Sequence, residues 1–272
     1  FYPAVGIYVR GIIMKLMVNH QTHYNYTETA KNSIQYIKMM PQTSLHQHVM
    51  NWAISVPGDK TLKRDIFNNI WITASQRYEY QHLTFMAQGI VELLNTEIGG
   101  VDVSIPINLF LQSTEATKYD AEMLDFAQRI VTVKDRQHIA LLSENILQKM
   151  PYQPDSTSVH TTATQAFQAG QGVCQDHAHV LIAMCRALQL PARYVSGYLF
   201  DQNSPHLASH AWAEVFLDNQ WYCFDVSNQL FTPKHHIYLA VGRDYLDVAP
   251  IRGVREKGGT ENMMSVVQVL AC

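Results

Sequence analysis

Apolar and polar residues alternate in short stretches along the first third of the chain. Between Leu16 and Ile107 these stretches, of which Leu45 to Pro57 is one, are separated by turn-forming residues such as Gly99-Gly100. An alternation with a period of two residues is typical of half-buried strands, and glycine and proline between strands mark turns. The pattern therefore predicts an antiparallel, β-sandwich-like N-terminal domain over residues 14–108.

After Pro106 the apolar residues recur at spacings of three and four, which is typical of amphipathic helices. Helices are predicted over residues 120–131 and 137–150, and another is predicted from Cys174 to a point before Pro191. This last helix is expected to bury a single stripe, made of Cys174, Ala178, Leu181, Cys185 and Leu188. Strands are predicted to follow over residues 192–200, 209–217 and 221–226. A second domain with helices followed by strands is therefore predicted over residues 109–272.

The composition agrees with a folded protein of two domains. The chain has 272 residues, of which 47% are hydrophobic and 16% charged, and this excludes a disordered or collagen-like chain. Its formal net charge is −3, without a basic stripe, so we expect no nucleic acid partner. The apolar stretch from Ala4 to Val18 contains Arg10 and Lys15 and is too short to span a membrane, so we expect no membrane partner either. Residues 1–13 are interpreted as an extension ahead of Met14.

The cysteines are spaced too irregularly for a disulfide framework or a C-x-x-C pair. They are Cys174, Cys185, Cys223 and Cys272. Free thiols are typical of a reducing compartment, which favours a cytoplasmic location.

Cys174 has a position that suits a nucleophile, because it is expected in the first turn of a helix. The positive end of the helix dipole favours the thiolate there. A thiol nucleophile also needs a base and a group that orients the base, and His210 and Asp225 are the candidates. If the turn at Asp218-Asn219 has two or four residues, Asp225 lies opposite Trp212 and diagonal to His210, about 7–8 Å away on the same face. A three-residue turn without a bulge would put the two side chains on opposite faces.

Several of these motifs resemble one family. The chain contains GQGVCQDHAHVLIAMCRALQLPARYVSGYLF, then SHAWAEVFLDNQWYCFDVSNQ and then AVGRDYLDVAPIRGV. Together they resemble the bacterial transglutaminase-like proteins, which are often described as cysteine proteases, over about residues 160–270. The segment THYNYTETAKNSIQYIKMMPQ, within residues 20–95, more weakly resembles the β-rich N-terminal domain of the same group.

The resemblance implies a papain-like, transglutaminase-like α+β catalytic core. It implies that Cys174 is the nucleophile, His210 the general base and acid, and Asp225 the carboxylate that orients His210. One departure is that Val226 follows Asp225 where the family usually has proline. A strand accommodates valine at least as well as proline, so this change is not expected to affect the triad.

Other polar residues near Cys174 were weighed as ligands. His177 and His179 would lie about 200° apart on a helix and would not share a metal ion, so no metal site and no cofactor are expected. The resemblance implies that Asp176 and His179 support the start of the helix, whereas His177 is expected to be a partly exposed helix residue.

An oxyanion formed by attack of Cys174 would need two hydrogen-bond donors. The backbone N–H of Cys174 is the natural first donor, and Gln168 and Tyr152 are candidates for the second. Trp212 suits either a wall of the substrate cleft or the core of the sheet.

The expected function is acyl transfer from an amide or peptide carbonyl, with a protein, peptide or small amide as substrate. Water is the default acceptor, which favours a cysteine peptidase or amidase. The alternatives are a protein-glutamine transglutaminase, in which an amine is the acceptor, and a non-catalytic relic of the fold that binds a peptide.

Overall fold

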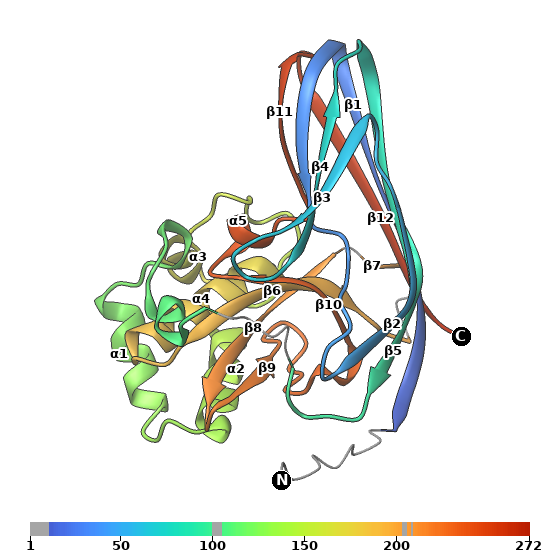
Figure 1. The fold of residues 1–272 in the computed structure, drawn as a ribbon. Helices are drawn as coiled ribbons and strands as arrows, with labels where there is room; N and C mark the ends of the chain where they lie inside the picture. The colour runs from blue at the N-terminus through green and yellow to red at the C-terminus, as the bar shows by residue number, and fades with distance from the viewer. Residues whose placement is uncertain (1–10, 100–104, 203–205, 208) are drawn as a thin grey trace.

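The computed structural model describes residues 11–99, 105–202, 206–207 and 209–272, and it contains two antiparallel sheets and a group of helices (Figure 1). Residues 1–10 of the expected N-terminal extension lie outside the described residues, whereas Ile12 already pairs with Leu94 in the first sheet. Of the described helices, none is long and apolar enough to cross a membrane.

The larger sheet is built around β1, an unusually long strand that spans Ile12–Ile37. The strands β4 and β5 follow one edge of β1, and β11 and β12 follow the other, all antiparallel to it. Three further strands pair outside these, with β2 on β5, β3 on β4 and β7 on β12. The bounds are β2 Gln47–Ser55, β3 Asp59–Arg64, β4 Ile70–Gln76, β5 Tyr80–Leu94, β7 His206–Leu207, β11 Ile251–Lys257 and β12 Glu261–Ala271.

This sheet bends over at a crest, where β11 and β12 stand on opposite sides in Figure 1. The bend coincides with left-handed backbone at Asn32, Lys257, Gly258 and Gly259, whose φ angles lie between 47° and 98°. At Gly259 a Cβ atom would lie 2.3 Å from Thr27 Oγ1, so the turn needs glycine. The two layers below the crest enclose one apolar cluster that combines side chains of β4 and β5. The predicted sandwich-like domain is therefore formed by one sheet that folds onto itself.

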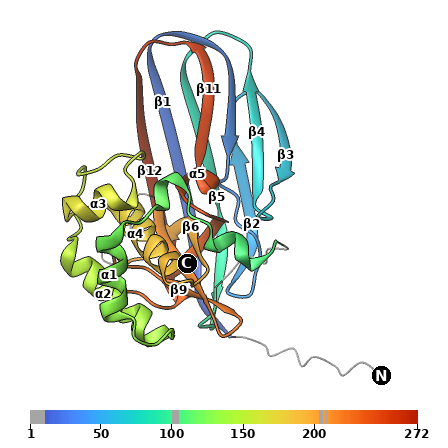
Figure 2. The same ribbon diagram turned by 90° about the vertical axis from the view of Figure 1, so that its left-hand side faces the viewer.

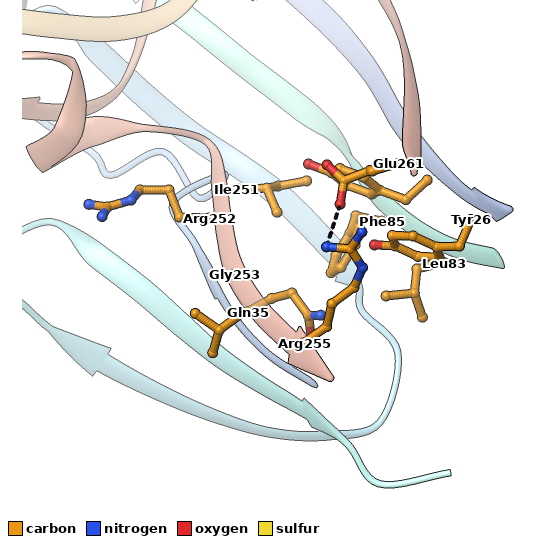
Figure 3. A pocket seen from close by; sticks show the side chains of 11 residues that line it. Tyr26, Gln35, Leu83, Phe85, Ile251, Arg252, Gly253, Arg255 and Glu261 are labelled. Carbon is orange, nitrogen blue, oxygen red and sulfur yellow. Dashed lines mark ion pairs between the residues drawn. The ribbon is translucent and has the colours of Figure 1, made fainter. Parts of the chain in front are cut away.

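A small cavity of about 120 Å³ lies between the two layers. Figure 3 shows Arg255 and Glu261 on its wall, with 3.6 Å between the guanidinium and the carboxylate. The guanidinium also lies 4.6 Å from the centre of the Tyr26 ring. These side chains come from β1, β11 and β12 and hold the layers together near the crest.

Residues 251–271 belong to this first sheet, through the pairing of β11 and β12 with β1. The sequence-based division at residue 108 assigned them to the second domain, and the structure differs because a strand pattern does not reveal which sheet the strand joins. The first sheet therefore contains strands from both ends of the sequence.

The second sheet has the order β10-β6-β8-β9 and carries the central helix α4 on one face. Figure 2 shows α1, α2 and α3 grouped around α4 beside the tall sheet. The strands are β6 Ala192–Leu199, β8 His210–Leu217, β9 Gln220–Phe224 and β10 His236–Gly242. The helices are α1 Ala121–Ile130, α2 Arg136–Lys149, α3 Ala163–Ala169, α4 Cys174–Ala187 and α5 Tyr245–Val248, with short 3₁₀ turns at Ile107–Leu111, Glu115–Thr117 and Pro233–His235. The α+β class expected from the sequence is confirmed.

Helix α4 is buried on every side, because all residues from Gln175 to Arg186 are buried. The expectation of a single buried stripe was wrong. The sheet covers one side of the helix and the other helices cover the opposite side, so both faces are removed from water.

The two sheets are joined at the edge of β10 by side-chain amides. Asn69 Nδ2 donates to Val241 O at 2.8 Å, and Val241 N donates to Asn69 Oδ1 at 2.8 Å. Gln47 makes the equivalent pair of bonds with Tyr238 on the same strand. Both amides are fully buried, so they satisfy backbone groups that a neighbouring strand would otherwise pair with.

Candidate active site

Cys174 is the first residue of α4, and the turn ahead of it is held by Asp176. One carboxylate oxygen of Asp176 accepts from Val173 N at 2.8 Å and from the Thr157 hydroxyl at 2.6 Å. At Gly172 a Cβ atom would lie 2.7 Å from the Cβ of Asp176, so only glycine fits beside this carboxylate. Burial raises the pKa of Asp176. Asp176 thus fixes the direction in which the chain enters the helix.

Tyr152 is brought beside this turn by a short parallel bridge between residues 152 and 172. Gln153 N donates to Gly172 O at 2.9 Å, and the Tyr152 ring, which is half exposed, lines the same cleft as Cys174. Gln168 does not line this cleft. Its Nε2 donates to Asp120 Oδ2 at 3.1 Å, at the start of α1, so of the two candidates for a second oxyanion donor only Tyr152 lies at the cleft.

His210 and Asp225 are brought together by the hairpin of β8 and β9. The connection consists of Asp218 and Asn219, both with positive φ, and Leu217 pairs with Gln220 across it. A two-residue turn with left-handed backbone at both positions matches the twist of the flanking strands. The register places both side chains on one face, and His210 Nε2 lies 2.7 Å from Asp225 Oδ2.

Asp225 is fully buried, and several donors converge on its Oδ2. Besides His210 Nε2, Oδ2 accepts from Asn228 Nδ2 at 2.9 Å and from His236 Nε2 at 3.1 Å. Burial alone would favour the neutral acid, but the His210 charge and these hydrogen bonds hold the pKa of Asp225 well below its usual range. Asp225 is therefore an anion at neutral pH.

The ring of His210 lies between this carboxylate and the Cys174 thiol. Burial opposes a charge on the ring, but the Asp225 carboxylate and the hydrogen-bonded Cys174 thiol outweigh burial and raise the pKa of His210 to about 10. Because Nε2 faces Asp225, Nδ1 is the ring nitrogen left for the thiol.

Cys174 and His210 open into a cleft of about 390 Å³. Its other lining residues are Tyr152, Leu199, Ser209, Ser227 and Asn228. A second hollow of about 290 Å³ shares Leu199 and Asn228 with the cleft and continues to Leu230 and His235. The thiol therefore lies at one part of a longer groove that could accommodate an extended chain.

The remaining polar residues of α4 bind to the protein itself. His177 is buried, with Nδ1 2.8 Å from Ser227 Oγ and Nε2 2.8 Å from Met150 O, so the expectation that it is partly exposed was wrong. His179 is also buried, and its Nε2 accepts from Tyr245 N at 3.1 Å. The two rings have separate partners, so they do not form the metal-ligand pair that was weighed from the sequence.

Trp212 belongs to the core and not to the wall of the cleft. It is buried beneath His210, with 5.8 Å between the ring centres, and it supports the imidazole from below.

Sequence reasoning missed the role of His236, the first residue of β10. The ligand-type atoms of His210, Asp225 and His236 lie within 4.8 Å of one another. The hydrogen bonds of 2.7 and 3.1 Å to Asp225 account for this closeness, since both imidazole N–H groups donate to Oδ2. The local sequence did not indicate the contact between His236 and Asp225, because this contact depends on the position of β10 next to β6 in the sheet.

The known proteins that this chain resembles match it over most of its length. Residues 16–92 match the family model described as the bacterial transglutaminase-like N-terminal region, and residues 125–226 match the model described as the transglutaminase-like superfamily. An uncharacterized protein of Mycobacterium leprae (strain TN) is 26% identical over 274 residues, which cover 94% of this chain and 98% of the relative. An uncharacterized protein of Mycobacterium tuberculosis (strain H37Rv) is 28% identical over 274 residues, which cover 87% of this chain and 86% of the relative.

One solved structure shares the fold over nearly the whole chain. It is the crystal structure of a protein from Cytophaga hutchinsonii that is described as a candidate cysteine protease. It has a TM-score of 0.76 and 21% identity, and it covers 95% of this chain and 90% of that chain. The combination of the bent sheet and the α+β core is therefore an established architecture.

Proposed function

Because this chain belongs to the transglutaminase-like superfamily, we propose that it is a thiol-dependent acyl-transfer enzyme, a cysteine peptidase or amidase with Cys174, His210 and Asp225 as its triad. One observation carries the proposal. The ring of His210 lies between the Cys174 thiol and the buried Asp225 carboxylate, and both Cys174 and His210 line a cleft.

The proposed reaction begins from an ion pair in which the proton of the Cys174 thiol already resides on His210, since the pKa of His210 is raised to about 10. The thiolate sulfur then attacks the carbonyl carbon of the substrate, and the carbonyl oxygen becomes an oxyanion. The imidazolium returns its proton to the amide nitrogen as the carbon–nitrogen bond breaks, which releases the amine and leaves a thioester. Asp225 keeps His210 Nε2 occupied throughout, so that Nδ1 is the nitrogen that exchanges the proton.

The second half of the reaction returns the enzyme to its starting state. Water attacks the thioester carbon while His210 takes one of its protons, and the thiolate then leaves as the acid product forms, which restores the thiolate–imidazolium pair. The oxyanion of each step would receive hydrogen bonds from the backbone N–H of Cys174 and from the Tyr152 hydroxyl.

Hydrolysis is proposed over amine transfer because the cleft is accessible to water. Tyr152 at its rim is 49% exposed, so water can pass this side chain to reach the thioester. The four free cysteines support a further part of the proposal, namely that the enzyme works in the cytoplasm.

The test is a reaction of the whole protein with casein-derived peptides in the presence of excess dansylcadaverine, analysed by mass spectrometry. We expect shortened or deamidated peptides with the wild-type protein and none with Cys174→Ala. The matched control is Cys272→Ala, which removes an exposed thiol outside the cleft and should leave the products unchanged.

Two other results would overturn this proposal in different ways. A predominance of dansylcadaverine adducts over hydrolysed products would identify a transglutaminase. Equal products from wild-type protein and Cys174→Ala, or peptide binding without any product, would identify a module that has lost the chemistry.

A further inference from the structure

A second imidazole binds the carboxylate behind the proposed triad. His236 Nε2 lies 3.1 Å from Asp225 Oδ2, the same oxygen that lies 2.7 Å from His210 Nε2. His236 is fully buried and does not line the cleft, so it has no access to a substrate. The one hydrogen bond of its ring among the described residues is with Asp225, the group that orients the base.

The ring of His236 is held on several sides. The centre of the Trp212 ring lies 4.6 Å away, and a Cβ at Gly197 on the intervening strand β6 would lie 2.7 Å from the Trp212 ring, so glycine leaves room for it. Two residues further along β10, Tyr238 is fixed by the Gln47 amide and by the His46 ring, whose centre lies 4.0 Å from that of Tyr238. The N-terminal sheet thus contributes to the placement of His236.

The tautomer of His236 follows from its surroundings. Nε2 carries the proton because the partner is a carboxylate, whereas Nδ1 is buried without a hydrogen-bond partner among the described residues. A proton on Nδ1 would have nothing to bind to, and burial lowers the pKa of His236, so the ring is a neutral donor. The titratable groups that face it are Asp225, His210, His235 and His46.

We propose that His236 is a positioning residue for the acyl-transfer reaction, and that its Nε2–H fixes Asp225 Oδ2 at the distance from which it orients His210. This inference rests on the proposed function. The physical reason is that Oδ2 receives three donors while Oδ1 receives one, the backbone N of Asn228 at 3.2 Å. Without His236 the carboxylate can rotate toward its less occupied oxygen, and His210 loses its fixed orientation.

Two variants of similar size separate the hydrogen bond from the volume of the side chain. In His236→Gln the side-chain Nε2 can still donate to Asp225, whereas His236→Met fills the space without a donor. The measurement is the rate of iodoacetamide alkylation at Cys174, read by peptide mass spectrometry at half-unit steps from pH 5 to 9. Cys272, which is exposed, serves as the internal reference, and the thermal unfolding midpoint reports whether each variant is folded.

We expect Cys174 to react faster than Cys272 at pH 6 in the wild-type protein. We expect this rate to fall about 10-fold in His236→Met and less than about 3-fold in His236→Gln, since a hydrogen bond to a charged group contributes enough to account for a 10-fold change. An unchanged pH profile in a folded His236→Met would overturn the role of His236 and leave the proposed function standing. A slow Cys174 in the wild-type protein would instead count against the proposed function itself.

A measurement on the wild-type protein covers the case in which His236→Met does not fold. Long-range ¹H–¹⁵N spectra of the histidine rings should show His236 as a neutral Nε2–H tautomer between pH 7 and 8. A neutral Nδ1–H tautomer would be incompatible with the donation to Asp225.

Discussion

Gln47 pairs with the backbone of Tyr238 as an adjacent strand would. Its Nε2 donates to Tyr238 O at 3.0 Å, and its Oε1 accepts from Tyr238 N at 2.8 Å. A residue of the first sheet thereby completes the edge of the strand that begins with His236. The N-terminal sheet is thus connected to the candidate site through defined hydrogen bonds and not merely through apolar contact.

The substitution Gln47→Met should lower the free energy of unfolding by about 2–4 kcal/mol. It keeps the volume of the side chain but leaves the buried N–H and C=O of Tyr238 without partners, and each such group costs about 1–3 kcal/mol. Urea denaturation followed by circular dichroism measures the change. Gln88→Ala, at an exposed position of the same sheet, is the control and should change stability by less than about 0.5 kcal/mol. Equal free energies of unfolding for the two variants would show that the Gln47 amide does not stabilise the packing of the two sheets.

Gly172→Ala should slow the alkylation of Cys174, because the new Cβ would lie 2.7 Å from that of Asp176 and push this residue from the turn ahead of α4. The matched control is Gly170→Ala. Its φ of 64° strains an alanine by about 1 kcal/mol, but the nearest atom to its Cβ is Lys149 O at 3.6 Å. We expect Gly170→Ala to lose stability with little change at Cys174. If Cys174 is alkylated at the wild-type rate in both variants, the close packing of Gly172 against Asp176 does not determine the reactivity of the Cys174 thiol.

Tyr152→Phe should lower kcat about 10- to 100-fold at an unchanged KM, if the phenol is the second donor to the oxyanion. Burial raises the pKa of Tyr152, so the hydroxyl keeps its proton at neutral pH. Gln168→Ala is the control, because the Gln168 amide binds Asp120 and is expected to have no effect on kcat. Steady-state rates on a peptide substrate measure both variants. If Tyr152→Phe keeps the wild-type kcat, the Tyr152 hydroxyl is not the second donor to the oxyanion.

The protein should lose stability as the pH falls from about 6.5 to 4. Burial lowers the pKa of His46 and of His179 to about 3, below the value of 6.5 in the unfolded chain. In this window the unfolded chain binds protons that the folded protein does not bind. Each ring therefore lowers the free energy of unfolding by about 1.4 kcal/mol for each unit by which the pH falls. Above pH 6.5 both rings are neutral in either state, and this contribution to stability is fully present.

The variant His179→Gln should reduce that pH dependence, because its side-chain oxygen can still accept from Tyr245 N but does not titrate. Urea unfolding at pH 7, 6, 5 and 4 measures the slope for both proteins. The slope should be smaller in the variant by about 1 kcal/mol per pH unit. Identical slopes would mean that His179 is not the source of the acid sensitivity.

Local sequence patterns predicted the hairpin that carries His210 and Asp225, but they left the length of its turn open. The structure has the two-residue connection, Asp218-Asn219, which is one of the lengths expected to place both side chains on one face. Helices α1 and α2 were also predicted nearly to their ends from the spacing of their apolar residues, and the structure adds that Asp120 and Asp135 cap their first turns.

Other features depend on tertiary placement that a single sequence does not reveal. His236 reaches Asp225 only because β10 lies next to β6, and nothing in the local pattern indicates that neighbour. His177 appeared exposed because its helix was expected to have one buried face, whereas helices and the sheet enclose α4 from both sides. The pairing of β11 and β12 with β1 is likewise a contact between the two ends of the sequence.

That pairing sets an order of events during synthesis. Strand β1 can pair with β4 and β5 early, but its other edge remains open until the whole α+β core has been translated and β11 and β12 emerge. Contacts between such distant segments form slowly, and an open strand edge is prone to pairing with other chains in the meantime. The core therefore has the opportunity to fold first, and the nascent chain depends on β11 and β12 to shield β1 from aggregation.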